Sequence, residues 1–207
     1  MQTPEFIYFD LGKVLLEFSH ERMCAQMGEL VGLDAKATHE IVFSSQLGDR
    51  YETGEIDDAQ FCELFFEQAG KSCDPKQLLE AAGDIFTMIR EMLPLVAALA
   101  TCGIPIGILS NTCPVHWNHV TDGRFAFLPA MFQKTVLSYE VGARKPLLEI
   151  YKIAAEVAGV EPAKIFFVDD REDNVEGAIA AGFDAHVFQS PRQVQQLLIE
   201  RGVRFGY

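Results

Sequence analysis

Three short apolar runs, each ending in polar residues, constrain the fold of this chain more than any other feature. Residues 6–9, 104–109 and 165–168 are strand-sized stretches of aliphatic and aromatic side chains. Continuous apolar runs of this length are typical of strands that are buried on both faces. A shorter run at 185–188 predicts a further strand. Pro105 predicts that the second strand begins late, because proline has no amide hydrogen to donate.

Helical patterns alternate with these runs in the second half of the chain. Residues 147–158 and 174–181 have helical spacing of apolar side chains, and Gly159 and Gly182 are placed as stops. Alternating strands and helices predict an α/β fold, with a parallel sheet and helices on both faces. Such sheets bind ligands beyond the carboxyl ends of their strands.

Residues 19–89 differ from the rest of the chain because they are mostly helical, and we expect no strand there. Residues 57–60 and 74–77 are typical helix starts, with Asp followed by helix-forming residues or by Pro. A helical insertion after the first strand would form a small cap domain with hinges near Phe18 and Leu93. The predicted division is a core domain at 1–18 and 90–207 and a helical cap domain at 19–89.

Charge and cysteine content restrict the partners. The 207 residues carry a formal net charge of −13, which opposes binding to nucleic acid. A small phosphate ester can still bind, because a helix N-terminus, a lysine and a cation can reverse the potential within one pocket. The five cysteines show no metal or redox spacing, and we expect reduced thiols. No signal peptide or membrane span is apparent, so we expect a cytoplasmic protein, monomeric or homodimeric.

The residues at the predicted strand ends suggest phosphoryl chemistry. Asp10 directly follows the first strand, where a carboxylate can attack phosphorus if a cation screens the charge repulsion. Asp169 and Asp170 follow the third strand and offer the hard oxygen ligands that Mg²⁺ prefers. Ser110 and Lys145 could stabilise the negative charge on a phosphoryl group.

Four ordered segments resemble the motifs of the haloacid dehalogenase superfamily. They are Phe9-Asp10-Leu11-Gly12-Lys13-Val14, Leu109-Ser110-Asn111-Thr112, Arg144-Lys145-Pro146 and Val168-Asp169-Asp170-Arg171-Glu172-Asp173-Asn174. Within the superfamily the chain most resembles small bacterial phosphatases with an Asp-Leu-Gly opening, such as glucose-1-phosphate phosphatase. The resemblance implies a Rossmann-like core with a helical cap inserted after the first motif. It also implies a Mg²⁺-dependent phosphomonoesterase that acts on a small phosphorylated metabolite, for example a sugar phosphate, through an aspartyl-phosphate.

The resemblance also implies roles for individual residues. Asp10 would be the nucleophile and a metal ligand, with the carbonyl of Gly12 and the side chain of Asp170 as further ligands. Asp169 is a possible addition to this set.

The same resemblance implies which residues hold the phosphate. Ser110, Asn111 and Lys145 would bind it, and Lys145 would also take part in catalysis.

One position departs from the family pattern. Most phosphatases of the superfamily carry an acid/base aspartate two residues after the nucleophile, where this chain has Gly12. Loss of a general acid/base costs about 10²–10⁴-fold in rate. Two alternatives therefore stay open: a 2-haloacid dehalogenase, and a non-catalytic relative that binds a phosphorylated ligand or a protein. The Asp169-Asp170 pair argues against the dehalogenase, because a carboxylate pair makes little sense where no cation binds.

Overall fold

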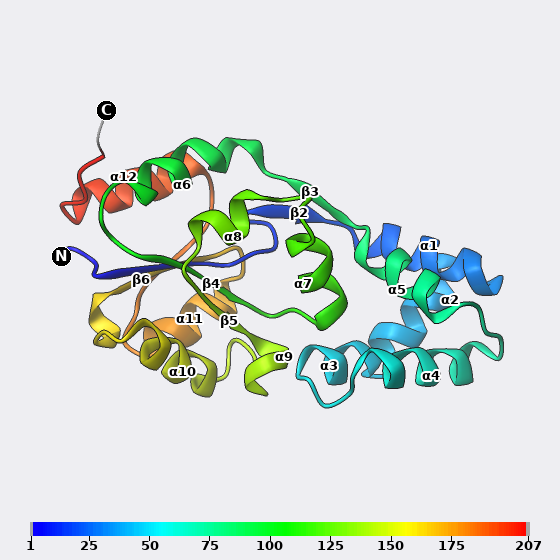
Figure 1. Ribbon diagram of the computed structural model, residues 1–207. Coiled ribbons are helices and arrows are strands. Elements are labelled where there is room, and N and C mark those ends of the chain that lie inside the picture. Colours follow the sequence, from blue (N-terminus) through cyan, green and yellow to red (C-terminus); the bar gives the residue numbers. More distant parts are fainter. Residues whose placement is uncertain (1, 206–207) are drawn as a thin grey trace.

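The computed structural model describes residues 2–205 and shows a twisted parallel sheet between two layers of helices (Figure 1). Every strand of this sheet runs parallel to its neighbours. The strand order is β5-β4-β1-β6-β7, with β1 (Phe6–Phe9), β4 (Ile106–Ser110), β5 (Lys134–Leu137), β6 (Ile165–Asp169) and β7 (Asp184–Val187). The predicted α/β class is confirmed, and the second strand begins after Pro105 as expected.

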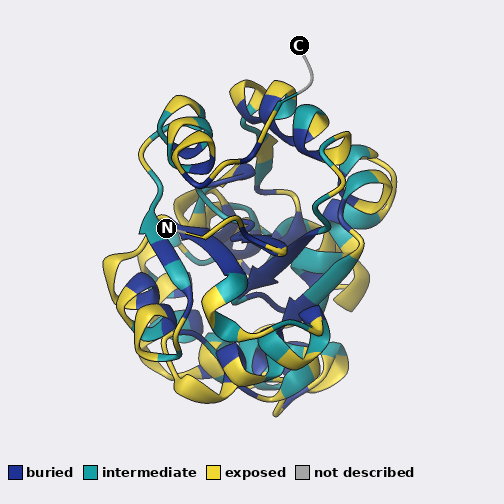
Figure 2. Ribbon diagram, turned by 90° about the vertical axis from the view of Figure 1, so that its left-hand side faces the viewer, coloured by how far each residue is buried: buried dark blue, intermediate teal, exposed yellow. Residues whose placement is uncertain are grey.

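The central strand β1 is apolar throughout because both of its faces are covered. Ile7 and Phe9 pack into the cluster on one face of the sheet, together with residues of α6 and α12. Phe6 and Tyr8 pack on the other face against α10 and α11. All four side chains are buried, and the strands lie as a dark layer between the helices in Figure 2.

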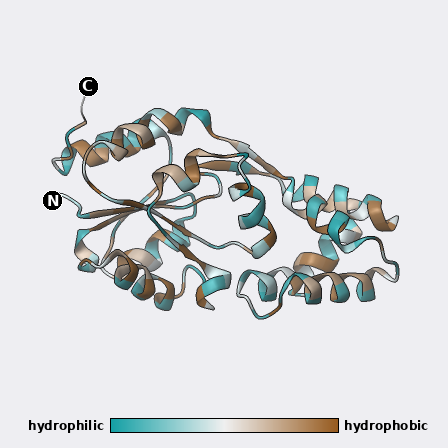
Figure 3. Ribbon diagram, in the orientation of Figure 1, coloured by the Kyte–Doolittle hydropathy of each residue, from teal (hydrophilic) through white to brown (hydrophobic). Residues whose placement is uncertain are grey.

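Helices cover both faces of the sheet with their apolar sides turned inward (Figure 3). One layer contains α6 (Leu93–Ala100) and α12 (Pro191–Glu200), and the other contains α10 (Leu148–Ala158) and α11 (Glu172–Ala180). The remaining elements of this part are η2 (Arg90–Met92), α7 (Pro114–Thr121), α8 (Phe127–Met131), α9 (Ser138–Val141) and η3 (Pro162–Lys164). The helices predicted at 147–158 and 174–181 correspond to α10 and α11.

A separate group of helices, residues 20–83, lies beyond one end of the sheet (Figure 1). We call it the helical unit. It has its own apolar cluster, to which the start of α7 contributes Cys113 and Val115. Asp57 and Asp74 cap two of its helices as predicted. Its elements are α1 (His20–Val31), α2 (Ala35–His39), the π-helical turn η1 (Glu40–Ser44), α3 (Leu47–Glu52), α4 (Asp58–Ala69) and α5 (Pro75–Gly83).

Two short antiparallel strands, β2 (Leu16–Phe18) and β3 (Phe86–Met88), connect the sheet to the helical unit. The expectation of no strand within 19–89 is therefore wrong at β3. Three residues are too few to show a periodic pattern, and these strands form because the two connections run side by side. The domain division itself stays a prediction.

None of the helices within residues 2–205 has the length and apolar character needed to cross a membrane. The cytoplasmic location stays a prediction.

Candidate active site

The polar residues that end three strands lie together at one edge of the sheet. The register of β1 with β4 and β6 brings Asp10 beside Ser110 and Asp169, because parallel strands that pair in register end at the same edge. A cavity of about 470 Å³ opens there, and Asp10, Gly12, Ser110, Lys145 and Asp170 line it.

Lys145 forms hydrogen bonds with two carboxylates at the cavity, those of Asp10 and Asp169. Its Nζ donates to Asp10 Oδ1 at 2.8 Å, to Asp169 Oδ2 at 2.5 Å and to the carbonyl of Leu109 at 2.9 Å. Only 1% of the residue is exposed. Burial alone would lower the pKa of Lys145, but the two carboxylates outweigh it and raise the pKa above the ordinary value. The ammonium group therefore stays charged.

The cluster around Lys145 carries more negative than positive charge. Burial raises the pKa of Asp10, and the nearby Asp169 carboxylate raises it further, while Lys145 opposes both effects. Burial and Asp169 raise the pKa of Asp170 as well. One lysine thus lies among three carboxylates, those of Asp10, Asp169 and Asp170. A bound cation would reduce this excess of negative charge.

The chemistry of these donors fits a hard divalent cation. Oxygen atoms of Asp10, Asp169 and Asp170 lie within 4.8 Å of one another, and carboxylate oxygens are preferred ligands of Mg²⁺. Both oxygens of Asp169 already accept hydrogen bonds, from Lys145 and from Asn174 Nδ2 at 2.9 Å. Asp170 is the least buried of the three. Asp10 and Asp170 therefore have more freedom to bind an ion than Asp169.

Ser110 and Asn111 differ in what their side chains contact. Ser110 is buried at the end of β4, and its Oγ makes only a long 3.3 Å bond to the adjacent carbonyl of Asn111. The Asn111 side chain accepts from the amide of Lys145 at 2.8 Å and donates to its carbonyl at 2.9 Å. Ser110 thus has a hydroxyl to offer a ligand, whereas Asn111 fixes the backbone of Lys145.

The outer side of the cavity includes Phe18, His20, Glu52, Phe86 and His116. Several of their rings contact one another, including Phe18 with His20 at 4.9 Å between centroids and Phe86 with His116 at 5.3 Å. Nε2 of His116 is buried without a hydrogen-bond partner among the described residues. No local sequence pattern identifies these residues, because they come from four separate segments that come together only in the folded chain.

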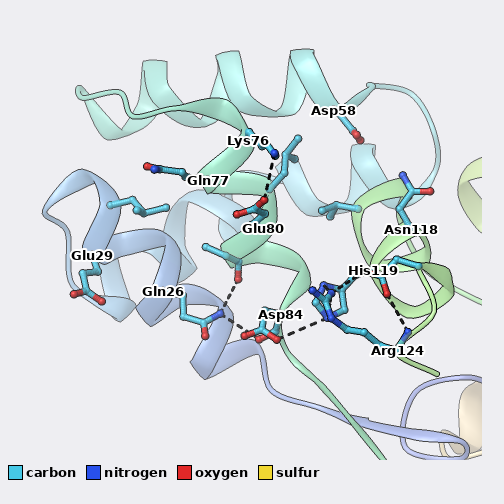
Figure 4. Close-up of a pocket in the computed structure, with 15 residues that line it drawn as sticks. Gln26, Glu29, Asp58, Lys76, Gln77, Glu80, Asp84, Asn118, His119 and Arg124 are labelled. Atoms are coloured by element: carbon cyan, nitrogen blue, oxygen red, sulfur yellow. Dashed lines mark hydrogen bonds and ion pairs between the residues drawn. The ribbon is translucent and has the colours of Figure 1, made fainter.

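A second and larger cavity, of about 1070 Å³, lies between α1, α5 and α7 (Figure 4). Several of its polar groups are paired, in part with residues outside the lining such as Arg22. Asp84 pairs with Arg22 at 2.5 Å, and Gln26 donates to the carbonyl of Ala81 at 2.8 Å. Arg124 pairs with Asp122 at 2.8 Å. No cluster suited to a metal ion occurs there among residues 2–205, so the smaller cavity is the candidate active site.

Comparison with known proteins identifies the family. The model of the haloacid dehalogenase-like hydrolases matches residues 7–182. The chain belongs to this family. It is therefore a hydrolase, and the four motifs that suggested the resemblance all lie within the matched region.

Solved structures of other proteins share this fold. A family enzyme from Bacteroides thetaiotaomicron, solved with magnesium and inorganic phosphate, is 28% identical, with a TM-score of 0.79 over 89% of this chain and 94% of its own. The L-2-haloacid dehalogenase of Xanthobacter autotrophicus, 20% identical over 99% of this chain and 85% of its own, has a TM-score of 0.64 and shows the fold alone.

A curated relative is the flavin mononucleotide hydrolase 1 of Arabidopsis thaliana, whose name assigns it to the chloroplast. It is 29% identical over 153 residues, or 74% of this chain. The chain spans 61% of the length of that relative. The finer resemblance to glucose-1-phosphate phosphatases stays a prediction.

Proposed function

We propose that this hydrolase is a Mg²⁺-dependent phosphomonoesterase that forms an aspartyl-phosphate on Asp10. The observation that carries the proposal is the arrangement of Lys145 between Asp10 and Asp169, with Asp170 beside them. The lysine holds the Asp10 carboxylate in one orientation and favours its ionised form against the effects of burial and Asp169. Once ionised, an oriented carboxylate at a cavity surface is a competent nucleophile.

The roles of the other residues follow from their positions. Asp10, Asp170 and the carbonyl of Gly12 would hold Mg²⁺, which would supply positive charge against the phosphoryl oxygens. The Ser110 hydroxyl and the Lys145 ammonium would donate to the same oxygens. Asn111 would act through Lys145, whose backbone it binds on both sides. Asp169 would fix Lys145 and so serve as support for the ligand set.

The helical unit would act as a cap in this proposal. Residues 19–89 would form a domain that closes over the core at 1–18 and 90–207, and closure would exclude water from the cavity. The cavity volume of about 470 Å³ suits a small phosphate ester. Flavin mononucleotide, by analogy with the plant relative, and sugar 1- and 6-phosphates are the substrates to test first.

The proposal is tested by a screen of phosphate esters with and without Mg²⁺, in which release of phosphate and of halide from 2-haloacids is followed in parallel. We expect phosphate release that needs Mg²⁺ and no halide release. Asp10→Asn should lower turnover at least about 10³-fold, because an amide is a poor nucleophile. Asp170→Asn should weaken the Mg²⁺ response.

The matched control for both variants is Asp122→Asn, which removes a carboxylate far from the cavity and should leave turnover unchanged. Halide release would instead favour the dehalogenase. The complete absence of turnover, with phosphate binding retained, would favour a non-catalytic relative.

A further inference from the structure

Gly12 lacks not only an acidic side chain but also the space for one. A Cβ atom built on Gly12 would lie 2.6 Å from Cε1 of Phe18, which is closer than carbon atoms approach in proteins. The ring of Phe18 therefore fills the place beside the backbone where a side chain at this position would start. If the leaving group of a phosphate ester is protonated, the proton must come from another residue.

The histidines that line the cavity are poor candidates for this role. Burial lowers the pKa of His116 to about 4, with His20 contributing further, and burial also lowers the pKa of His20. Both imidazoles are therefore neutral near pH ~7. Asp173 is unsuitable for the same reason, because hydrogen bonds from Arg171 keep its pKa below the ordinary value and leave it without a proton to give.

Glu52 is the carboxylate that the helical unit contributes to the cavity. It is the last residue of α3 and is half-buried. Its carboxylate accepts no hydrogen bond from any side chain or amide within residues 2–205, in contrast to Asp169. Burial raises the pKa of Glu52, and the Asp49 carboxylate raises it further. The guanidinium of Arg144 is the main opposing charge, with weaker opposing effects of Lys145 and Arg171. A partly desolvated carboxyl group of this kind keeps its proton to a higher pH than an exposed one, which suits a general acid.

The end of α3 is attached directly to the phosphate-binding side of the cavity. Ser138 Oγ donates to the carbonyl of Glu52 at 2.6 Å and accepts from the amide of Thr112 at 3.0 Å. Thr112 lies two residues after Ser110. The Ser138 hydroxyl therefore joins the end of α3, which carries Glu52, to the loop that follows β4. Gly54 approaches the core closely as well, since a Cβ there would lie 2.1 Å from the carbonyl oxygen of Tyr139.

We infer that Glu52 is the proton donor to the leaving group and, after that group departs, the base for water, in place of the acid that Gly12 cannot supply. The inference rests on the proposed phosphatase function. In the first step Asp10 bonds to phosphorus, the bond from phosphorus to the leaving oxygen breaks, and Glu52 gives its proton to that oxygen. In the second step Glu52 takes a proton from water, the water oxygen bonds to phosphorus, and the bond to Asp10 breaks. Orthophosphate leaves, and Glu52 is protonated again.

The test is Glu52→Gln, compared with the wild type on phenyl, 4-chlorophenyl and 4-nitrophenyl phosphate in the presence of Mg²⁺. These probes have similar shapes but differ in the acidity of the phenol that leaves. The less acidic the phenol, the more its departure depends on protonation. We expect kcat/KM for phenyl phosphate to fall about 10²-fold or more and that for 4-nitrophenyl phosphate to fall less than tenfold. Rapid mixing with 4-nitrophenyl phosphate should then show a burst of one nitrophenolate per enzyme, because the aspartyl-phosphate lacks its base.

Glu55→Gln is the matched control. It removes the same charge three residues further on, from an exposed side chain that pairs with Arg50, and should change no rate. Glu52→Asp keeps the carboxyl group and should recover part of the loss for phenyl phosphate. Urea denaturation and binding of inorganic phosphate with Mg²⁺ show whether each variant is folded.

Equal losses for all three esters, or none, in a folded Glu52→Gln protein would overturn the role of Glu52 while leaving the phosphatase intact. A wild type without phosphatase activity, or activity that survives Asp10→Asn, would overturn the phosphatase and this inference together.

Discussion

The two sides of the candidate active site are held in different ways. On the core side, Asp10 and Lys145 are buried and joined by a short ionic hydrogen bond. On the outer side, rings contact one another, the Glu52 carboxylate has no hydrogen-bond donor within the described chain, and Nε2 of His116 has no partner there either. A pre-assembled core side suits the phosphoryl group, which is the same in every substrate. A less constrained outer side leaves polar groups for the part of the substrate that varies.

The largest expected effect comes from removing the positive charge of Lys145 on the core side. Lys145→Met leaves Asp10 and Asp169 buried without their partner, which should lower the free energy of unfolding by about 3–5 kcal/mol and abolish turnover. Urea denaturation and phosphate release measure the two losses. Lys164→Met is the control, because Lys164 forms a surface pair with Glu5 at 2.6 Å and such pairs contribute about 0–1 kcal/mol. Similar losses for the two variants would mean that the core side is not pre-assembled.

An intermediate effect should follow from moving the end of α3, and with it Glu52, away from the core. Gly54 has φ of +70°, so Gly54→Ala adds backbone strain of about 1–2 kcal/mol as well as a clash with Tyr139. We expect kcat/KM to fall about tenfold or more because Glu52 moves with the end of α3. Gly70→Ala is a close control, since Gly70 has φ of +65° but no atom within 4 Å of its added Cβ. Equal activity in the two variants would contradict the attachment of α3 to the cavity.

The smallest expected effect concerns a core ion pair outside the cavity, and it separates the stability of the core from its chemistry. Burial alone would raise the pKa of Asp184, but hydrogen bonds from Arg201 and His186 outweigh it and hold the pKa far below its usual range. A carboxyl group with a lowered folded-state pKa stabilises the protein above its unfolded pKa of about 3.9, and this contribution is lost as the pH falls further.

We therefore expect Asp184→Asn to lower the free energy of unfolding by about 1 kcal/mol at about pH 7, after allowance for solvent screening, and by less at about pH 3. Urea denaturation at both pH values measures the difference, and turnover at pH ~7 should not change. A difference that is constant with pH would show that Asp184 acts through its shape and not through its charge.

Sequence patterns predicted most of the core side because Asp10, Ser110 and Asp169 lie at the ends of continuous apolar strands. The runs ending at Asp10, Ser110 and Asp169 predicted both the buried strands and the edge where their polar ends meet. The strand β5 was missed because Lys134–Leu137 is short, lies at the edge of the sheet and mixes polar with apolar residues.

The outer side could not be assembled from sequence in the same way. Phe18 fills the place beside Gly12 only because β2 and β3 pair, and no local pattern predicts that pairing. Glu52 reaches the cavity through tertiary contacts, chiefly the bond from Ser138. The residue types around a sequence motif do not predict such contacts between distant segments.

The central position of β1 has a consequence for how the chain is made. Ile7 pairs with Ile106 and Phe166, so the first strand to leave the ribosome must wait for about a hundred residues, or about 5–20 seconds of synthesis, before a neighbour exists. The helical unit is synthesised in that interval and draws mostly on contacts within itself. During translation it can become ordered while Phe6–Phe9 is still without a sheet neighbour, so the helical unit can bury most of its own core before the central strand is covered.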